Sequence, residues 1–95
     1  MYYNESTLVF LDGNWVKASE ISVSLYSQTL HYGIGVFEGI RSYKTEDGNK
    51  IFKAKEHFER LQYSASKMEI DLPYSVEELI DISYELLDKN GLGDA

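Results

Sequence analysis

The sequence has 95 residues, of which sixteen are acidic and nine are basic, giving a formal net charge of −7. The basic residues are scattered rather than gathered into a stripe, so binding to a nucleic-acid backbone is not expected. The same charge disfavours contact with anionic membrane surfaces. There is no cysteine, which excludes disulfides, zinc–thiolate sites and thiol nucleophiles, and the two histidines cannot form a metal site alone.

The length is enough for one domain with a modest hydrophobic core. The first five residues lack the basic segment followed by an apolar one that marks a signal peptide. No apolar run approaches the ~20 residues that a membrane-spanning helix needs. We therefore expect a soluble, cytoplasmic protein.

The N-terminal third of the sequence predicts a β-hairpin and little further regular structure. Over residues 7–18 the pair Asp12-Gly13 separates two apolar runs, and both residues tolerate the positive φ of a tight hairpin turn. Residues 19–25 alternate apolar and serine side chains, which predicts a short extended piece. A single helical turn is expected over residues 27–32.

A second hairpin is expected in the middle of the sequence. Residues 35–43 read as one strand, and residues 51–52 as part of the next. The pair Asp47-Gly48 supplies the turn within a loop of about five residues.

Residues 55–70 predict an amphipathic helix, because four apolar side chains recur at spacings of three and four residues. These side chains are Phe58, Leu61, Ala65 and Met68. Glu56 precedes Arg60 by four residues, which is the favourable order for an ion pair along a helix.

Residues 75–90 predict the second helix. Ser75 and Glu78 have the spacing of a capping box, and Gly91 supplies the stop. Strands that come first and helices that come after predict an α+β fold, with an antiparallel sheet built from hairpins and two helices packed on one face.

The predicted strand over residues 36–43 contains the candidate binding residues. Successive side chains of a strand point to opposite faces, so these residues divide into two sets. One face presents, in order, Phe37, Gly39, Arg41 and Tyr43. Glycine in a strand often marks close approach by a ligand, and an aromatic wall with a few polar groups suits a small-molecule pocket. The alternative is that Phe37 and Tyr43 are core residues and Arg41 pairs with an acidic neighbour.

The same segment also resembles a known protein family. The run LHYGIGVFEGIRSY over residues 30–43 is similar to the hallmark segment of the branched-chain members of the fold-type IV pyridoxal-phosphate enzymes. Residues 56–65 then match the family pattern E-H-x-x-R-L-x-x-S-A, and the resemblance extends over nearly the whole sequence. It implies that residues 1–95 are the N-terminal small domain of an aminotransferase.

The resemblance also implies roles for individual residues. Arg60 matches the arginine that binds the cofactor phosphate, and a guanidinium suits that role because it can donate two parallel hydrogen bonds. Phe37 matches a residue lining the pocket for the apolar substrate side chain, with Gly39 and Arg41 shaping that wall. Tyr32 matches a residue that reaches the pocket from the partner subunit of a dimer. The alternative for Arg60 is an exposed arginine paired with the glutamate one turn before it.

The resemblance further implies pyridoxal 5'-phosphate as cofactor and a Schiff-base lysine in a second domain. None of the seven lysines matches that position: Lys17, Lys44, Lys50, Lys53, Lys55, Lys67 and Lys89. The family's proton shuttle is that lysine, so His31 and His57 are expected to be structural. We expect these 95 residues to be inactive alone and their parent to be a dimeric enzyme that exchanges amino groups between branched-chain amino acids and 2-oxoglutarate.

Two other interpretations remain open. Within the same superfamily, the domain could belong to a D-amino-acid transaminase or an aminodeoxychorismate lyase. Outside catalysis, it could be a standalone binding module. The substrate profile of the full-length protein separates the enzymes from one another, because branched aliphatic L-amino acids favour the first interpretation and D-alanine opposes it.

Overall fold

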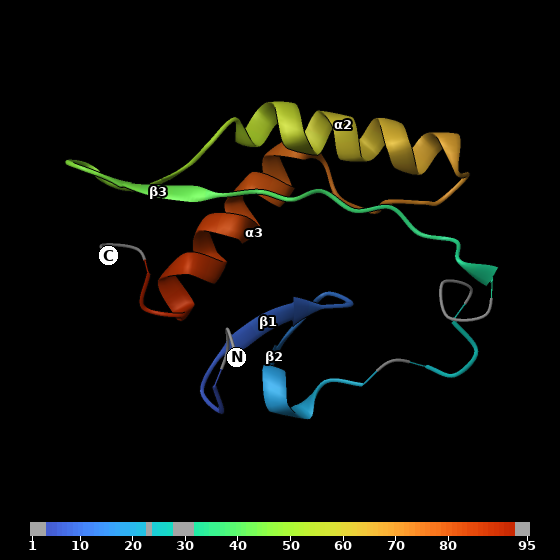
Figure 1. The fold of residues 1–95 in the computed structure, drawn as a ribbon, viewed down its shortest axis with the longest axis horizontal. Coiled ribbons are helices and arrows are strands. Elements are labelled where there is room, and N and C mark those ends of the chain that lie inside the picture. The colour runs from blue at the N-terminus through green and yellow to red at the C-terminus, as the bar shows by residue number, and fades with distance from the viewer. Residues whose placement is uncertain (1–3, 23, 28–31, 93–95) are drawn as a thin grey trace.

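The structure is a computed structural model that describes residues 4–22, 24–27 and 32–92. Its elements, in chain order, are β1 (Leu8–Leu11), β2 (Asn14–Lys17), the 3-10 helix η1 (Ala18–Glu20), β3 (Ser42–Thr45), β4 (Gly48–Ile51), α2 (Ala54–Lys67) and α3 (Val76–Lys89). Strands precede helices, so the expected α+β class is confirmed (Figure 1). The two hairpins form two separate two-stranded antiparallel sheets.

The first hairpin has the predicted position and turn. Strand β1 pairs with β2 so that Phe10 lies opposite Trp15, and the two rings meet edge to face with centroids 5.0 Å apart. Asp12 and Gly13 adopt φ values of 51° and 83°, as a type I′ turn requires. A side chain at Gly13 would be strained at this φ, and its Cβ would lie 3.3 Å from the hydroxyl oxygen of Tyr74.

The chain after this hairpin differs from the prediction. Residues 18–20 form a 3-10 turn, and the extended piece expected over residues 19–25 is not a strand in its described part. The side chain of Ser24 accepts a hydrogen bond from the backbone N–H of Tyr26, and the carbonyl of Ser24 accepts one from Ser27. Serine side chains compete in this way with strand pairing, which the alternation pattern does not register. The helical turn expected over residues 27–32 lies mostly outside the described residues.

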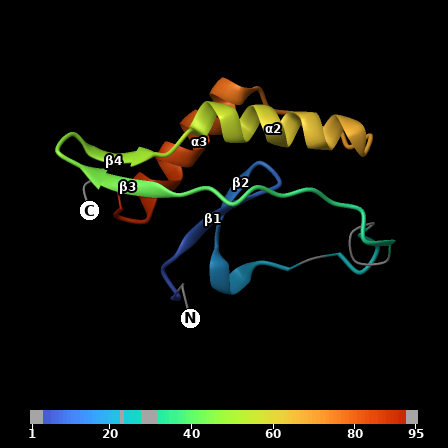
Figure 2. The same ribbon diagram turned by 45° about the horizontal axis from the view of Figure 1, so that its top comes forward.

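The second hairpin is present, but its first strand begins later than expected. Strand β3 starts at Ser42 and pairs with β4, which ends opposite it at Ile51. Residues 33–41 are not part of a strand, although the carbonyl of Arg41 still accepts a hydrogen bond of 2.8 Å from the N–H of Phe52. The predicted strand over residues 35–43 is therefore confirmed only at its end. This stretch instead runs as an extended segment alongside α2 in both views (Figures 1 and 2).

Both helices form as predicted, within three residues at each end. The capping box of α3 is complete, since the Ser75 hydroxyl accepts from the backbone of Glu78 and the Glu78 carboxylate accepts from the backbone of Ser75. Helix α3 stops at Gly91, which has φ 72°. Helix α2 stops in the same left-handed manner at Glu69, with φ 57°. Neither these nor any other helix of the described residues is long and apolar enough to cross a membrane.

Helix α3 and its C-cap residue connect the two hairpins, because their side chains form hydrogen bonds with backbone groups of both. The Asn90 side chain accepts a hydrogen bond of 2.7 Å from the N–H of Leu8 and donates one of 2.9 Å to its carbonyl. At the second hairpin, the N–H of Ile51 donates to the Tyr84 hydroxyl at 3.1 Å. Helix α3 therefore organises the fold, with β1 on one side and β4 on the other.

The described chain leaves much of its surface uncovered. Only Phe58 and Ala65, with 6% and 2% of their surface exposed, are fully buried apolar residues in the described ranges. The accessible surface is 7617 Å², whereas a compact protein of this mass exposes about 5,600 Å². The radius of gyration is 14.6 Å, against about 12 Å for a compact domain of this length.

Candidate cofactor and substrate site

The extended segment over residues 34–41 alternates between half-buried and exposed side chains, so the alternation predicted for residues 36–43 is present as far as Arg41, whereas Ser42 and Tyr43 are both exposed. Its inward-facing side chains are half-buried: Ile34, Val36, Glu38 and Ile40. The intervening residues are exposed: Gly35, Phe37, Gly39 and Arg41. An extended backbone has a side-chain period of two whether or not a neighbouring strand pairs with it. The segment therefore presents one face to the helices and one to solvent.

The exposed face carries three of the predicted pocket residues. Phe37 is 90% exposed, so it is not a core residue in this structure. Arg41 is exposed and makes no ion pair within the described part of the chain. Tyr32, 74% exposed, precedes the extended segment by two residues. Phe37, Gly39 and Arg41 are thus aligned along one side, while Arg60 lies toward the opposite side, on α2.

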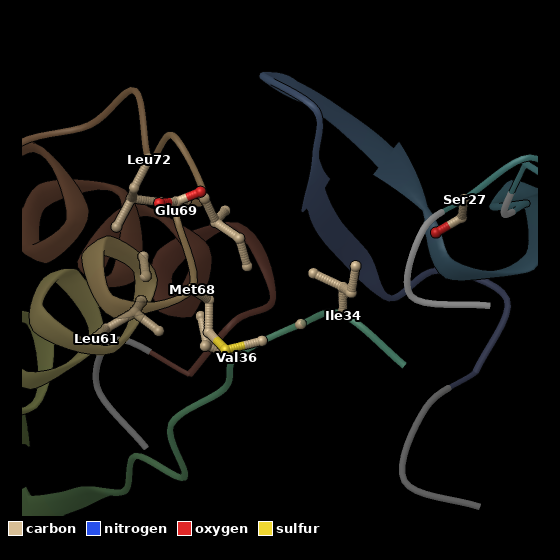
Figure 3. Close-up of a pocket in the computed structure, with 10 residues that line it drawn as sticks. Ser27, Ile34, Val36, Leu61, Met68, Glu69 and Leu72 are labelled. Carbon is tan, nitrogen blue, oxygen red and sulfur yellow. The ribbon is translucent and has the colours of Figure 1, made fainter. Parts of the chain in front are cut away.

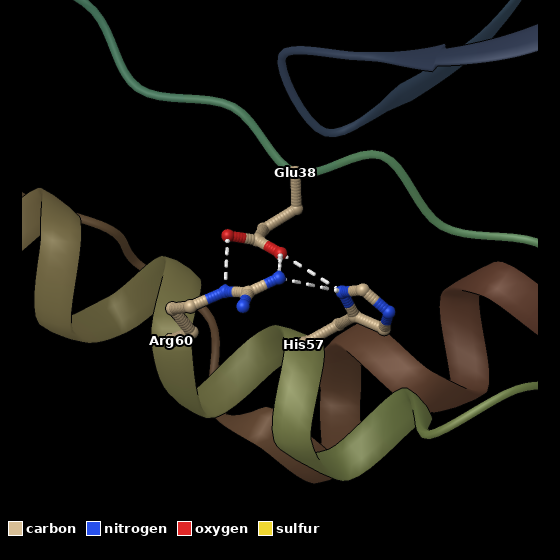
Figure 4. A network of polar contacts seen from close by, with 3 residues as sticks. All are labelled: Glu38, His57 and Arg60. Carbon is tan, nitrogen blue, oxygen red and sulfur yellow. Dashed lines mark hydrogen bonds and ion pairs between the residues drawn. The ribbon is translucent and has the colours of Figure 1, made fainter.

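Arg60 belongs to a three-residue polar cluster with Glu38 and His57 (Figure 4). Its Nε donates to one Glu38 oxygen at 2.9 Å and its Nη2 to the other at 2.7 Å. The Nδ1 atom of His57 lies 2.8 Å from the same Glu38 oxygen that Nη2 contacts, which requires a proton on Nδ1. The acidic partner of Arg60 is therefore Glu38, and the alternative pairing with Glu56 along the helix is wrong. Glu38 is the stronger partner because its side chain is only 9% exposed and its carboxylate accepts two parallel hydrogen bonds from the guanidinium.

The cluster fixes the charge state of Glu38. Hydrogen bonds from Arg60 and, next, from His57 lower the pKa of Glu38 from 4.5 to about 2. The same contact raises the pKa of Arg60. Both groups are therefore charged throughout the physiological pH range.

A lowered carboxyl pKa makes the contribution of Glu38 to stability depend on pH. Because the folded pKa lies below the unfolded value, this contribution is complete above about pH 4.5 and is lost as the pH falls through about 2. We expect the Glu38 side-chain carboxyl carbon to titrate near pH 2 in a carbon-13 NMR experiment. A midpoint near 4.5 would show that the cluster does not form in solution.

The remaining donors of Arg60 are available to an anion. A guanidinium has five N–H donors, and Glu38 uses two of them, one on Nε and one on Nη2. The Arg60 side chain is 64% exposed. It borders an open cavity of about 200 Å³ together with Lys53, Glu56 and His57. The arrangement can accept a phosphate without breaking the contact with Glu38.

A larger cavity lies elsewhere on α2. It measures about 680 Å³ and lies between the C-terminal half of α2 and the start of the extended segment. Figure 3 shows Leu61, Met68 and Val36 on one side of it and Ile34 and Ser27 on the other. Its lining is mostly apolar and does not include Arg60, so the donors suited to a phosphate lie with the cluster and not here. No group of three or more metal-ligating side chains is present in the described ranges.

Sequence reasoning missed Glu38. The signal was available, because Glu38 falls between Val36 and Ile40 on the face that packs inward. A charged residue in a half-buried apolar row needs a partner of opposite charge. The motif over residues 56–65 places Arg60 and His57 three residues apart, on one face of a helix.

Comparison with known proteins identifies the family to which the chain is similar. Residues 35–95 match the family described as amino-transferase class IV. The chain is 36% identical over 88 residues to the branched-chain-amino-acid aminotransferase of Pseudomonas aeruginosa, covering 93% of this chain and 29% of that protein. It is 44% identical over 86 residues to the D-alanine aminotransferase of Staphylococcus haemolyticus, covering 90% and 29%.

A solved structure resembles the fold closely. The branched-chain aminotransferase of the thermophilic archaeon Thermoproteus uzoniensis, with norvaline, superposes with a TM-score of 0.85 at 40% identity. The match covers 94% of this chain and 30% of that one. The chain thus spans less than a third of the length of the relatives that it matches. Its sequence and fold together place it in the class IV aminotransferase family, as the resemblance of residues 30–43 and 56–65 implied.

Proposed function

We propose that this chain is the N-terminal part of a pyridoxal-phosphate-dependent transaminase in which Arg60 binds the cofactor phosphate. The enzyme moves an amino group between branched-chain amino acids and 2-oxoglutarate. The observation that carries the proposal is the exposed guanidinium of Arg60, held on one edge by Glu38 and open on the other. Relatives named as branched-chain aminotransferases support the substrate class.

The residues around Arg60 suit a phosphate group. A second pair of parallel N–H donors, one on Nη1 and one on Nη2, forms the outer edge of the guanidinium. Such a pair matches two phosphate oxygens. Lys53 and Glu56 border the same cavity and carry opposite charges, so the attraction for an anion comes from the guanidinium of Arg60 itself. When bound, the cofactor supplies an electron sink at the substrate α-carbon.

The exposed face of the extended segment suits an apolar substrate. Phe37 offers a bare ring, and Gly39 beside it leaves room because it has no side chain. Arg41 offers a cation at the end of this face. We propose that the partner's Tyr32 completes the wall in a homodimer. The large uncovered surface of the chain supports its burial against further protein, since surface of this kind drives association.

The catalytic lysine and the other phosphate ligands would come from a second domain. We therefore expect the full-length protein to convert L-leucine, L-isoleucine and L-valine with 2-oxoglutarate, and the 95 residues alone to show no turnover. A coupled assay of 2-oxo acid formation measures both. Turnover of leucine by the purified 95-residue chain would contradict the second-domain proposal.

A second candidate has an observation in its favour. The D-alanine aminotransferase of Staphylococcus haemolyticus is 44% identical to this chain, which lies within the range of 36–45% found for branched-chain aminotransferases, so identity alone does not separate the two substrate classes. The two functions share a phosphate site and differ in the substrate pocket. D-alanine as the preferred donor in the same assay would establish the second candidate and reject the first. A non-catalytic binding module would show no turnover with either donor in the full-length form.

A further inference from the structure

We infer that Glu38 is a positioning residue for the phosphate-binding arginine, because it holds the inner edge of the Arg60 guanidinium so that the outer edge faces the cofactor phosphate. The inference rests on the proposed function of Arg60. It adds a second residue to the phosphate site, one that acts through Arg60 without touching the phosphate.

The first argument is the geometry of the pair. Nε and Nη2 of Arg60 donate to different oxygens of Glu38, at 2.9 and 2.7 Å, so two parallel bonds fix the plane of the guanidinium (Figure 4). An arginine side chain has many rotamers, and at 64% exposure this one has little restraint besides Glu38 and a contact of 3.4 Å between its Nη2 and the Nδ1 of His57. With its inner edge bound to Glu38, the guanidinium has its remaining donors on the outer edge.

The second argument is that Glu38 is itself held. Its side chain is 9% exposed and comes from the inward face of the extended segment. One oxygen accepts from both Arg60 and His57, and the other from Arg60. His57 and Arg60 lie three residues apart on α2, so both donors come from a single helix face. Independently of Arg60, the carboxylate is restrained by its burial and by the contact of 2.8 Å with His57, and it can therefore orient the guanidinium.

Glu38 could also weaken phosphate binding, and this alternative predicts the opposite effect of its removal on affinity. A carboxylate beside Arg60 also neutralises part of its positive charge, which would weaken attraction for a phosphate dianion. If neutralisation dominated, removal of the Glu38 charge would tighten phosphate binding. If positioning dominates, its removal weakens binding.

The test uses the apo form of the full-length protein and measures binding, not turnover. The dissociation constants of pyridoxal 5'-phosphate and of pyridoxal, which lacks the phosphate, are determined by fluorescence titration. The quantity compared is the dissociation constant of pyridoxal 5'-phosphate divided by that of pyridoxal. Because the two ligands differ only in the phosphate group, this ratio reports the contribution of the phosphate site. The variants are Glu38→Gln, Arg60→Ala and the double variant. Glu59→Gln serves as the matched control, since Glu59 is an exposed glutamate of α2 outside the cluster.

We expect Glu38→Gln to raise the dissociation constant of pyridoxal 5'-phosphate about tenfold and that of pyridoxal less than twofold. In the Arg60→Ala background, Glu38→Gln should leave the ratio unchanged, because the residue acts through Arg60. Glu59→Gln should match the wild type. If Glu38→Gln does not fold, Glu38→Asp decides, since it keeps the charge and withdraws the carboxylate by one methylene. We expect it to raise the ratio as well.

Two results overturn different claims. If Arg60→Ala raises the ratio and the Glu38 variants leave it unchanged or lower it, then the positioning role is wrong and Arg60 remains a phosphate ligand. If Arg60→Ala itself leaves the ratio unchanged, then the proposed phosphate site is wrong.

Discussion

Replacement of Arg60 by alanine is expected to weaken binding of pyridoxal 5'-phosphate to the full-length protein about 100-fold. The reason is that the outer edge of the guanidinium offers two charge-assisted hydrogen bonds, which are the strongest kind that a side chain can give a phosphate. Arg60→Lys should lower the affinity for pyridoxal 5'-phosphate about tenfold, because lysine keeps the positive charge but lacks the planar pair of N–H donors. Titration of the apo protein, followed by cofactor absorbance, measures both.

The control for this prediction is Lys55→Ala. Lys55 is an exposed cation in the first turn of the same helix, and it does not border the cavity beside Arg60. Its loss changes the net charge equally and should change cofactor affinity by less than about twofold. Equal effects of the two substitutions would indicate attraction by overall charge instead of a specific site.

The second large effect is expected at Asn90. Asn90→Ala removes the bonds of 2.7 and 2.9 Å to the backbone of Leu8, together with one of 2.9 Å to the Leu86 carbonyl. The Leu8 backbone N–H and C=O groups are part-buried and would be left without this partner, at a cost of about 2–3 kcal/mol in the free energy of unfolding. Asn90 has φ −98°, which alanine adopts without strain. Urea denaturation followed by the fluorescence of Trp15, the single tryptophan, measures the change.

Two further variants make the Asn90 prediction specific. Asn90→Asp keeps the acceptor for the Leu8 N–H but loses both donated bonds, so its effect should fall between wild type and Asn90→Ala. Asn14→Ala removes an exposed amide whose bond to the Asp12 carbonyl is 3.3 Å, and should cost less than about 0.5 kcal/mol. If Asn90→Ala were as mild as Asn14→Ala, the contact would be incidental.

The elements that sequence predicted well are those with local signals. The Asp12-Gly13 pair determines the first hairpin because its two φ values are positive, and the capping box at Ser75 determines the start of α3. Both signals lie within four residues of the structure that they specify. The periodicity of the apolar residues in α2 is likewise local.

The sequence did not predict which part of the chain lies beside the extended segment, or which acidic residue pairs with Arg60. Alternation specifies an extended backbone with two faces, and the predicted faces are found over residues 36–41 although not at Ser42 and Tyr43, but the pattern identifies no neighbouring strand. The helical spacing rule paired Arg60 with Glu56, whereas the structure pairs it with Glu38, 22 residues away. That pairing depends on how the segment lies along α2, which no short-range pattern encodes.

The contact between Asn90 and Leu8 also has a consequence for folding kinetics. The two residues are 82 positions apart, so bringing them together from the unfolded chain costs on the order of 4 kcal/mol of loop entropy. The hairpins and helices close over far shorter distances and can form first. We therefore expect the contact to form late, after the folding transition state. Its strength therefore acts on the unfolding rate, and a weaker contact would let the ends of the chain separate sooner without slowing their assembly.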